Sequence, residues 1–87
     1  SVNYNLEVAY LKNNNSLTVN YSSLKAGESA LNLTDLSGKS VFTETLGDTE
    51  IGENTKSVKL PSDLKAGIYI VHLNINNTFV SKKVYIQ

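Results

Sequence analysis

The chain has 87 residues, no cysteine, and eight lysines that balance eight acidic residues without any arginine. These numbers exclude a disulfide framework, a thiolate metal site and the basic surface that nucleic-acid binding requires, and no apolar run approaches the roughly 18 residues of a membrane span. One domain over residues 1–87 is expected, beginning as a mature fragment or an excised piece, since no charged-then-apolar opening resembles a signal peptide.

Apolar and polar residues alternate along almost the whole chain, which is the period of a β-strand, and no segment keeps a helical period. The alternation predicts seven short strands, in chain order around residues 6–10, 17–21, 31–33, 41–43, 58–60, 67–75 and 78–86. Seven strands in so short a chain predict an all-β fold, an immunoglobulin-like antiparallel β-sandwich.

The stretch DLSGK predicts a tight hairpin between the third and fourth strands. Asp35 suits the first position of a type I turn, and Gly38 suits the left-handed position of a glycine bulge. This three-residue hairpin pairs Asp35 with Lys39 and predicts that Leu33 faces Val41.

The tetrapeptide Leu-Lys-Ala-Gly occurs twice, at residues 24–27 and 64–67, each time before a run that alternates like a strand. In each copy a small capping residue, Ser23 or Asp63, is expected to start one helical turn, and the glycine to leave it in a left-handed conformation. The leucine of each copy is predicted to plug the core while the lysine stays in water. Both copies would then turn a corner between the two sheets.

Tyr69 follows the second copy by two residues and stands near the start of the longest predicted strand. A tyrosine there can bury its ring and hydrogen-bond upstream backbone through its hydroxyl, as in the tyrosine corner of Greek-key sandwiches. We therefore interpret Tyr69 as a structural anchor.

The last two strands form a predicted hairpin around Asn76-Asn77, because asparagine tolerates the positive φ angles of a two-residue type I′ turn. One face of this hairpin should enter the core, with the pairs Tyr69–Val84, Val71–Lys82 and Leu73–Val80. Lys82 shares that face, so it must reach solvent at a rim or the hairpin must contain a bulge. The opposite face of the hairpin carries apolar residues beside two polar ones, namely Ile68, Ile70, Phe79 and Tyr85 beside His72 and Lys83. Such an apolar face indicates a docking or dimer surface, unless another strand or loop covers it.

Residues with catalytic or metal-binding chemistry are few. His72 is the sole histidine and has no carboxylate near it in the sequence. We therefore favour the interpretation that His72 is a strand residue exposed to solvent or to a partner, and not a general base. No catalytic residue, cofactor or metal is predicted. One acidic cluster consists of Glu44, Asp48, Glu50 and Glu53. Its spacing matches no defined calcium loop, so a connection between strands that is exposed to solvent is favoured over a calcium site.

The stretches ALNLTDLSGKSV and LPSDLKAGIYIVHLNINNTFVSKKVYIQ resemble the type A C-terminal sorting domain of proteins exported by the type IX secretion system of Bacteroidota. The resemblance covers residues 17–87 and rests on an Asp-Leu-x-Gly-Lys hairpin, a Leu-x-x-Gly-x-Tyr corner and a closing Lys-Lys strand. The Tyr-Pro-Asn-Pro segment of the family is replaced by AYLKNNN, so the resemblance does not fix the domain border within residues 1–16. The predicted recognition residues are Asp35, Gly38, Lys39, Leu64, Gly67, Ile68, Tyr69, Ile70, Lys82, Lys83, Val84 and Tyr85.

This resemblance implies that the domain is an address at the end of a larger exported enzyme or adhesin. After Sec export to the periplasm, an outer-membrane translocon would recognise it on residues 67–87, and a sortase-like peptidase would remove it at the cell surface. The expected location is the surface or the medium. A homodimer through the C-terminal strands is a further expected partner.

Two other functions remain open from the sequence alone. One is a carbohydrate-binding or adhesive module, and the other is a structural spacer. Sugar platforms usually need coplanar exposed aromatic rings, and the chain has five tyrosines but no tryptophan. Tyr4, Tyr10 and Tyr21 are in phase with apolar neighbours, which favours the core or its rim for them.

Overall fold

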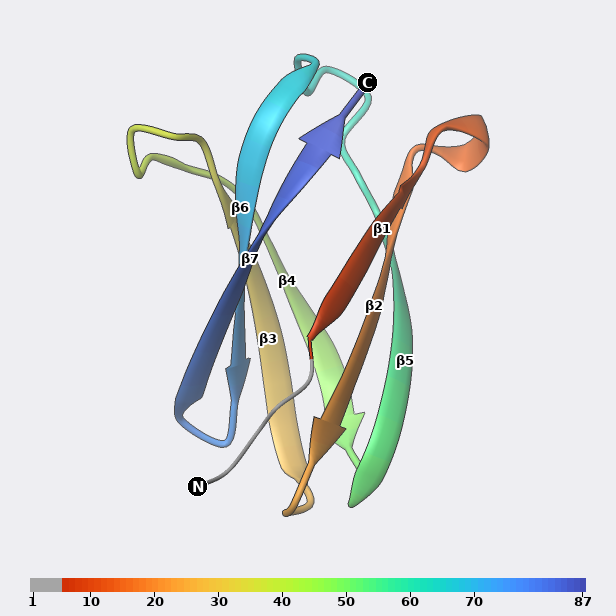
Figure 1. Ribbon diagram of the computed structural model, residues 1–87, viewed down its shortest axis with the longest axis vertical. Helices are drawn as coiled ribbons and strands as arrows, with labels where there is room; N and C mark the ends of the chain where they lie inside the picture. Colours follow the sequence, from red (N-terminus) through yellow and green to blue (C-terminus); the bar gives the residue numbers. More distant parts are fainter. Residues whose placement is uncertain (1–5) are drawn as a thin grey trace.

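The structure is a computed structural model that describes residues 6–87 as seven strands in two stacked antiparallel sheets (Figure 1). The strands are β1 (Glu7–Leu11), β2 (Ser16–Ser23), β3 (Gly27–Thr34), β4 (Ser40–Thr49), β5 (Gly52–Lys59), β6 (Gly67–Ile75) and β7 (Thr78–Ile86). One sheet has the order β1-β2-β5 and the other has the order β4-β3-β6-β7. This arrangement confirms the predicted all-β fold, an antiparallel sandwich of immunoglobulin type.

The core lies between the two sheets and is built from the alternate apolar residues of the strands. Successive side chains of a strand point to opposite faces, so each alternating segment turns one apolar face inward. Burial of one such side chain contributes about 1.5–3 kcal/mol. The buried apolar residues are Leu6, Leu17, Val19, Tyr21, Leu31, Leu33, Val58, Leu60, Tyr69, Val71, Leu73, Ile75, Val84 and Ile86.

Tyr21 is the one core aromatic besides Tyr69 in the described part of the chain, and its hydroxyl is satisfied inside the sandwich. It lies 2.9 Å from Ser29 Oγ and 2.8 Å from Thr49 Oγ1, and both of these residues are buried. This pairing meets the requirement that a buried hydroxyl keep a hydrogen-bond partner. Tyr10 is partly buried against the core, so both tyrosines lie where their phase predicts, and Tyr4 falls outside the described residues.

The DLSGK hairpin forms as predicted at its tip but shifts by one residue below it. Asp35 N–H donates to the Lys39 carbonyl at 3.0 Å, and Gly38 has a φ of 93°. Leu33, however, pairs with Phe42 and not with Val41. Val41 is an extra residue, a β-bulge, which the turn chemistry of the tip does not encode.

The two asparagine-rich connections are both tight. Asn76 and Asn77 have φ values of 50° and 66°, and Ile75 pairs with Thr78 across them, which confirms the two-residue type I′ turn. The segment between β1 and β2 is a 3₁₀ turn, Lys12–Asn14, closed by a left-handed Asn15. Asparagine adopts these positive φ values more readily than other residues with a Cβ.

Both Leu-Lys-Ala-Gly copies turn a corner between the sheets, as predicted, because β2 and β5 belong to one sheet and β3 and β6 to the other. The predicted helical turns are wrong, since neither copy has helical structure. In the first copy Ser23 Oγ donates to the Lys25 carbonyl at 2.7 Å and accepts from the Lys25 N–H at 3.2 Å. This clamp replaces a helical turn with a single sharp bend.

The leucines of these two corners, Leu24 and Leu64, differ in burial. Leu64 packs against the core, as predicted, at a connection where its own N–H donates to the Pro61 carbonyl. The plug predicted for Leu24 is wrong, because 65% of that side chain is exposed. The sharp bend at Ser23 leaves no length of chain to fold Leu24 back between the sheets.

No helix in residues 6–87 is long and apolar enough to cross a membrane.

Candidate functional site

The β6–β7 hairpin, which we call the terminal hairpin, pairs without interruption from Gly67–Ile86 at its open end to Ile75–Thr78 at its turn. The three predicted pairs are confirmed: Tyr69–Val84, Val71–Lys82 and Leu73–Val80. Lys82 belongs to the core face yet is exposed, and the register contains no bulge. Of the two alternatives for Lys82, the structure therefore selects the rim, where the long side chain reaches solvent.

Tyr69 forms the predicted tyrosine corner at the connection from β5 to β6. Its ring is 8% exposed, and its hydroxyl donates to the Lys65 carbonyl at 2.6 Å. The hydroxyl thus satisfies a backbone acceptor in the loop that leads into β6, while the ring packs in the core. This contact ties the open end of the terminal hairpin to the body of the sandwich.

The turn of the terminal hairpin is tied down at a second point, by Asn76. Its backbone N–H donates to the Glu28 carbonyl and its side-chain amide donates to the Lys25 carbonyl, both at 3.3 Å. The Asn76 side chain occupies the space beside Gly27, where a Cβ would overlap its Oδ1 atom. Glycine is required at residue 27 because Asn76 packs directly against its backbone.

A third contact holds the end of β7. The Tyr10 hydroxyl lies 3.2 Å from the Gln87 carbonyl oxygen and 3.0 Å from Asn15 Oδ1. The Asn15 amide donates to the Leu60 and Pro61 carbonyls, each at 3.3 Å. The end of β7, the first hairpin and the connection after β5 therefore meet in one polar cluster.

The face of the terminal hairpin that points away from the core carries apolar side chains that are largely uncovered by residues 6–87. Ile68, Phe79 and Tyr85 are 47%, 73% and 60% exposed, and Ile70 is half-buried. Ile68 pairs with Tyr85, and Ile70 is the next residue of β6 on the same face, so these three side chains adjoin. We call Ile68, Ile70 and Tyr85 the outer strip; Phe79 lies apart, near the turn, where it pairs with Asn74.

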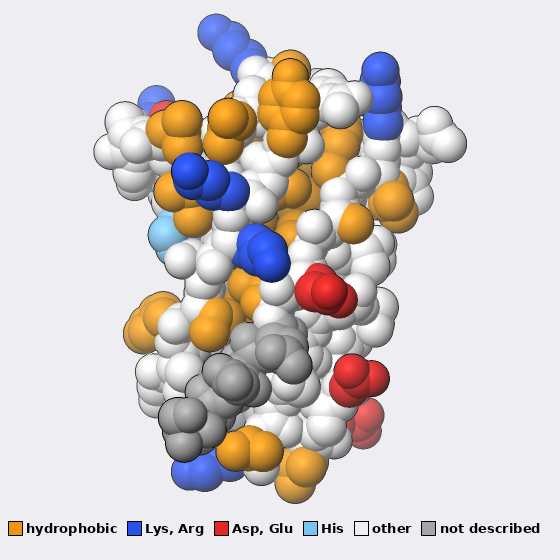
Figure 2. All heavy atoms as spheres, in the orientation of Figure 1, with side chains coloured by type: hydrophobic (Ala, Val, Ile, Leu, Met, Phe, Trp, Pro, Cys, Tyr) orange, Lys and Arg blue, Asp and Glu red, His pale blue; other side chains and the backbone are white. Residues whose placement is uncertain are grey.

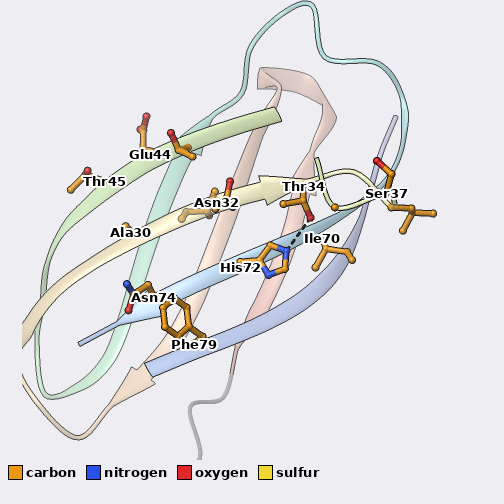
Figure 3. A pocket seen from close by; sticks show the side chains of 14 residues that line it. Ala30, Asn32, Thr34, Ser37, Glu44, Thr45, Ile70, His72, Asn74 and Phe79 are labelled. Carbon is orange, nitrogen blue, oxygen red and sulfur yellow. Dashed lines mark hydrogen bonds between the residues drawn. The ribbon is translucent and has the colours of Figure 1, made fainter. Parts of the chain in front are cut away.

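The outer face of the four-stranded sheet contains a groove of about 870 Å³ that brings the two predicted motifs together (Figure 3). The DLSGK tip supplies Leu36, Ser37 and Gly38 to its wall. The floor is formed by β3, β4, β6 and β7, with Ala30, Asn32, Thr34, Glu44, Thr45, Ile70, His72, Asn74 and Phe79 among the lining residues. The hairpin tip and Ile70 of the outer strip therefore line the same groove, although about thirty-five residues separate them in the sequence.

His72 lies on the floor of this groove. Its Nε2 atom is 3.0 Å from Thr34 Oγ1 (Figure 3). Among the hydrogen bonds of residues 6–87, Thr34 is the side-chain partner of this imidazole, and no carboxylate is bonded to it. His72 and Thr34 thus form a cross-strand polar pair on the sheet.

Asp35 organises the hairpin tip at the edge of the groove. Its Oδ1 atom accepts hydrogen bonds from Ser37 Oγ at 2.6 Å, Ser37 N–H at 2.9 Å and Lys39 N–H at 3.0 Å. The Ser37 hydroxyl, followed by the Lys39 N–H, holds the pKa of the Asp35 carboxyl below its usual value. Asp35 therefore shapes the turn, and Leu36 projects from it with 62% of its side chain exposed.

The acidic residues predicted to be a solvated connection lie on β4, on β5 and between them. In residues 6–87 no three His, Cys, Asp or Glu side chains are grouped so as to hold a metal ion. Glu50 N–H and carbonyl are instead engaged by the side chain of Asn54, at 2.9 Å each. That amide closes the turn between the two strands.

Comparison with protein families matches residues 12–87, nearly the whole chain, to the secretion system C-terminal sorting domain. The chain belongs to this family. No curated protein is significantly similar to it. The sorting domains of this family are the signals of type IX secretion, so the match confirms the C-terminal sorting domain that the three motifs resemble. Membership implies a type IX secretion system, an attached N-terminal cargo and export to the cell surface or the medium.

The motif residues of this sorting domain occupy two kinds of position. Some hold the fold: Asp35 and Gly38 shape a turn, Gly67 begins β6 with a positive φ, Tyr69 and Val84 are buried, and Leu64 packs on the core. The others are accessible to a partner, namely Lys39, Ile68, Lys82, Lys83 and Tyr85, with Ile70 half-buried beside them. The accessible set lies mostly on the terminal hairpin.

Two features of the site were absent from the sequence interpretation. Leu36 joins the groove, and its position after Asp35 in a tight turn, which forces it outward, was the available signal. Asn76 packs against Gly27, a contact between the last turn and the first corner that no local pattern announces. The comparisons give the carbohydrate-binding alternative no support.

Proposed function

We propose that the sorting domain directs a cargo through the periplasm to an outer-membrane type IX translocon, which recognises the terminal hairpin by its outer strip. The observation that supports this proposal is the exposure of the adjoining apolar side chains Ile68 and Tyr85 on a hairpin anchored at three points. Exposed apolar surface of this kind is typical of interaction sites.

The chemistry of the strip favours a protein partner. Lys83 pairs with Ile70 across the hairpin, so an ammonium group borders the apolar surface. Apolar surface with a charged rim is the composition of protein interfaces, where the apolar part supplies affinity and the charge supplies orientation. After translocation, a sortase-like peptidase would separate the domain from its cargo.

The domain acts, in this proposal, as an address and not as a catalyst. The proposal is supported by the hydrogen bonding of His72, whose partner is a threonine hydroxyl and to which no carboxylate of residues 6–87 is hydrogen-bonded. Recognition residues would thus be Ile68, Ile70, Lys83 and Tyr85, with the remaining motif residues holding them in place.

The test is a secretion assay in a type IX-competent host, with a periplasmic reporter fused in front of the 87-residue chain. The wild-type fusion should release the reporter outside the cell. Ile70→Lys should reduce release at least about tenfold, because a second ammonium group would break the apolar surface. Ser57→Lys, on the exposed face of β5 in the other sheet, is the matched control and should be released normally.

Folding must be measured beside secretion, because a charge on a half-buried residue can also destabilise the sandwich. The melting temperature of Ile70→Lys should fall only slightly, and an unfolded variant would contradict a recognition role for Ile70. Sedimentation of the same proteins tests the homodimer: a second copy bound on the strip predicts a wild-type dimer that Ile70→Lys converts to a monomer.

A further inference from the structure

We propose that β7 accepts an extended acidic segment of a partner protein as an additional antiparallel strand along the edge from Phe79 to Lys83. The inference rests on the proposed function, in that the translocon recognises the terminal hairpin, and it adds the mode of binding and the chemistry of the bound segment. β7 is the last strand of the sheet β4-β3-β6-β7, so one side of its backbone is not paired by β6.

The turn determines which backbone groups of β7 face that open side. In a two-residue hairpin the residues that flank the turn, here Ile75 and Thr78, exchange both backbone hydrogen bonds, and bonded and non-bonded pairs then alternate. The N–H and C=O groups of Val80, Lys82 and Val84 accordingly point to β6. Those of the intervening residues, Phe79, Ser81, Lys83 and Tyr85, point to the edge.

The opposite edge of the sheet, β4, is unsuited to strand addition. Val41 and Leu46 are each an extra residue that interrupts pairing with β3, and Gly47 has a φ of 79°. Glu44 and Asp48 add like charges along the same strand. Bulges and charges are the devices by which proteins protect edges, and β7 has no bulge.

The Lys56 ammonium group of β5 reaches across to β4 and donates to the Asp48 carbonyl at 2.8 Å, so one backbone acceptor of β4 is already engaged. The last residues of β7 are held within the sandwich, since Val84 and Ile86 are buried and the Tyr10 hydroxyl contacts the Gln87 carbonyl. The open part of β7 is therefore its first half.

In this first half the side chains of both faces are accessible. Ser81 and Lys83 on the outer face are exposed, Lys82 on the core face is exposed, and Val80 is half-buried. An incoming strand would pair with the backbone of Ser81 and Lys83 without displacing a residue of the described chain from those groups. Its own side chains would lie beside Lys82 on one face and Lys83 on the other.

Charge complementarity identifies the partner segment. Lys82 and Lys83 place an ammonium group on each face of the edge, and lysine side chains lie over β7 in Figure 2, whereas most of the carboxylate surface visible there lies towards the three-stranded sheet. Asp or Glu residues opposite the two lysines would form cross-strand pairs, whereas basic residues would be repelled. Backbone pairing gives such a segment affinity, and the carboxylates fix its register.

The binding test uses the 87-residue chain and a synthetic eight-residue peptide that repeats Thr-Thr-Glu-Glu, so that glutamates lie on both faces of the added strand, with amide hydrogen exchange followed by NMR. Without peptide, the Ser81 and Lys83 amides should exchange faster than those of Val80 and Lys82. Saturating peptide should slow Ser81 and Lys83 at least about tenfold and leave the β4 amides unchanged. Equal slowing of both edges, or none at Ser81, would overturn the proposal.

Ser81→Pro separates backbone pairing from side-chain recognition. Proline removes an N–H that points to the open edge and not to β6, so the hairpin should keep its fold and its melting temperature. In the secretion assay Ser81→Pro should lower reporter release at least about tenfold, and Ser81→Ala should leave it unchanged. Normal release of a folded Ser81→Pro fusion overturns strand addition while the sorting function stands, whereas failure of the wild-type fusion overturns the sorting function itself.

A charge exchange covers the case in which Ser81→Pro does not fold. The double variant Lys82→Glu, Lys83→Glu should lose the slowing caused by the threonine–glutamate peptide and show it instead with a threonine–lysine peptide of the same length. If the variant binds both peptides as the wild type does, the charges take no part and the acidic partner is excluded.

Discussion

Residues 24–27 and 64–67 have the same four amino acids and perform the same topological task, yet they make different contacts. The first copy ends in a bend clamped by Ser23, with Leu24 exposed and Gly27 covered by Asn76. The second copy folds its leucine onto the core and places Gly67 near the ring of Tyr69, where a Cβ would have only an ordinary contact at 3.9 Å. Identical local sequence has defined a corner, and the surrounding strands have decided what each residue of the corner does.

The comparison also separates two reasons for a glycine. Gly27 and Gly67 have nearly the same φ, 159° and 153°. They differ in what lies beside the missing Cβ. For Gly27 it is the turn of the terminal hairpin, which makes this glycine part of the anchoring of the recognition surface.

The largest expected effect is therefore an asymmetry between two alanine substitutions. Gly27→Ala should lower the free energy of unfolding by about 3 kcal/mol, because the methyl group must displace Asn76, whereas Gly67→Ala should cost about 1 kcal/mol. Urea denaturation of both variants measures the difference. Adding Asn76→Gly to Gly27→Ala should recover most of the loss, since glycine keeps the positive φ of the turn, and equal losses in the two single variants would contradict the contact.

A smaller asymmetry is expected for the two leucines. Leu64→Ala removes a partly buried side chain and should lower stability by about 1–2 kcal/mol, and Leu24→Ala should change it by less than about 0.5 kcal/mol. The same denaturation experiment compares the two. A loss at Leu24 as large as that at Leu64 would show that the first copy also contributes a plug to the core.

The smallest expected effect concerns the DLSGK turn and its dependence on pH. In this turn the Asp35 side chain bonds to nearby backbone, as the Ser23 side chain does at the first corner. Asp35 has a lowered pKa in the folded chain, so its stabilising contribution is present above the unfolded value of about 3.9 and is lost as the pH falls through the folded value. Below pH 4 the protection of the Ser37 and Lys39 amides should fall, once exchange is corrected for its intrinsic pH dependence, while the Lys25 amide at the Ser23 bend should show no such step.

Asp35→Asn is the control for this titration. It keeps an oxygen acceptor at the turn and removes the ionisable group, so the acid-dependent increase in exchange should disappear. A step of unchanged size in Asp35→Asn would assign the pH dependence to another group.

The fold was predictable because its determinants are local. Alternation gives the seven strands, Asn76-Asn77 sets the register of the terminal hairpin, and the spacing from Gly67 to Tyr69 gives the tyrosine corner. The errors occur where length or long-range packing decides. A bulge at Val41 depends on how β4 fits against β3, and the exposure of Leu24 depends on the bend that Ser23 makes.

The candidate site was predictable in composition and only partly in arrangement. The apolar outer face of the terminal hairpin follows directly from the period of two, and the position of Lys82 follows from the register once the absence of a bulge is known. The proximity of the DLSGK tip to Ile70 across the groove arises from strand order, as does the contact of Asn76 with the first corner. Neither follows from spacing along the chain.

The strands lie along the longest dimension of the domain, which measures 34 Å against 27 and 18 Å for the others (Figure 1). A pull along that axis would load the hydrogen-bond ladders in shear, so that many backbone bonds would have to fail together and could not unzip one after another. The domain should therefore resist force best in the direction in which its strands run. A force applied along this axis would move the whole domain before it separated the strands of a sheet.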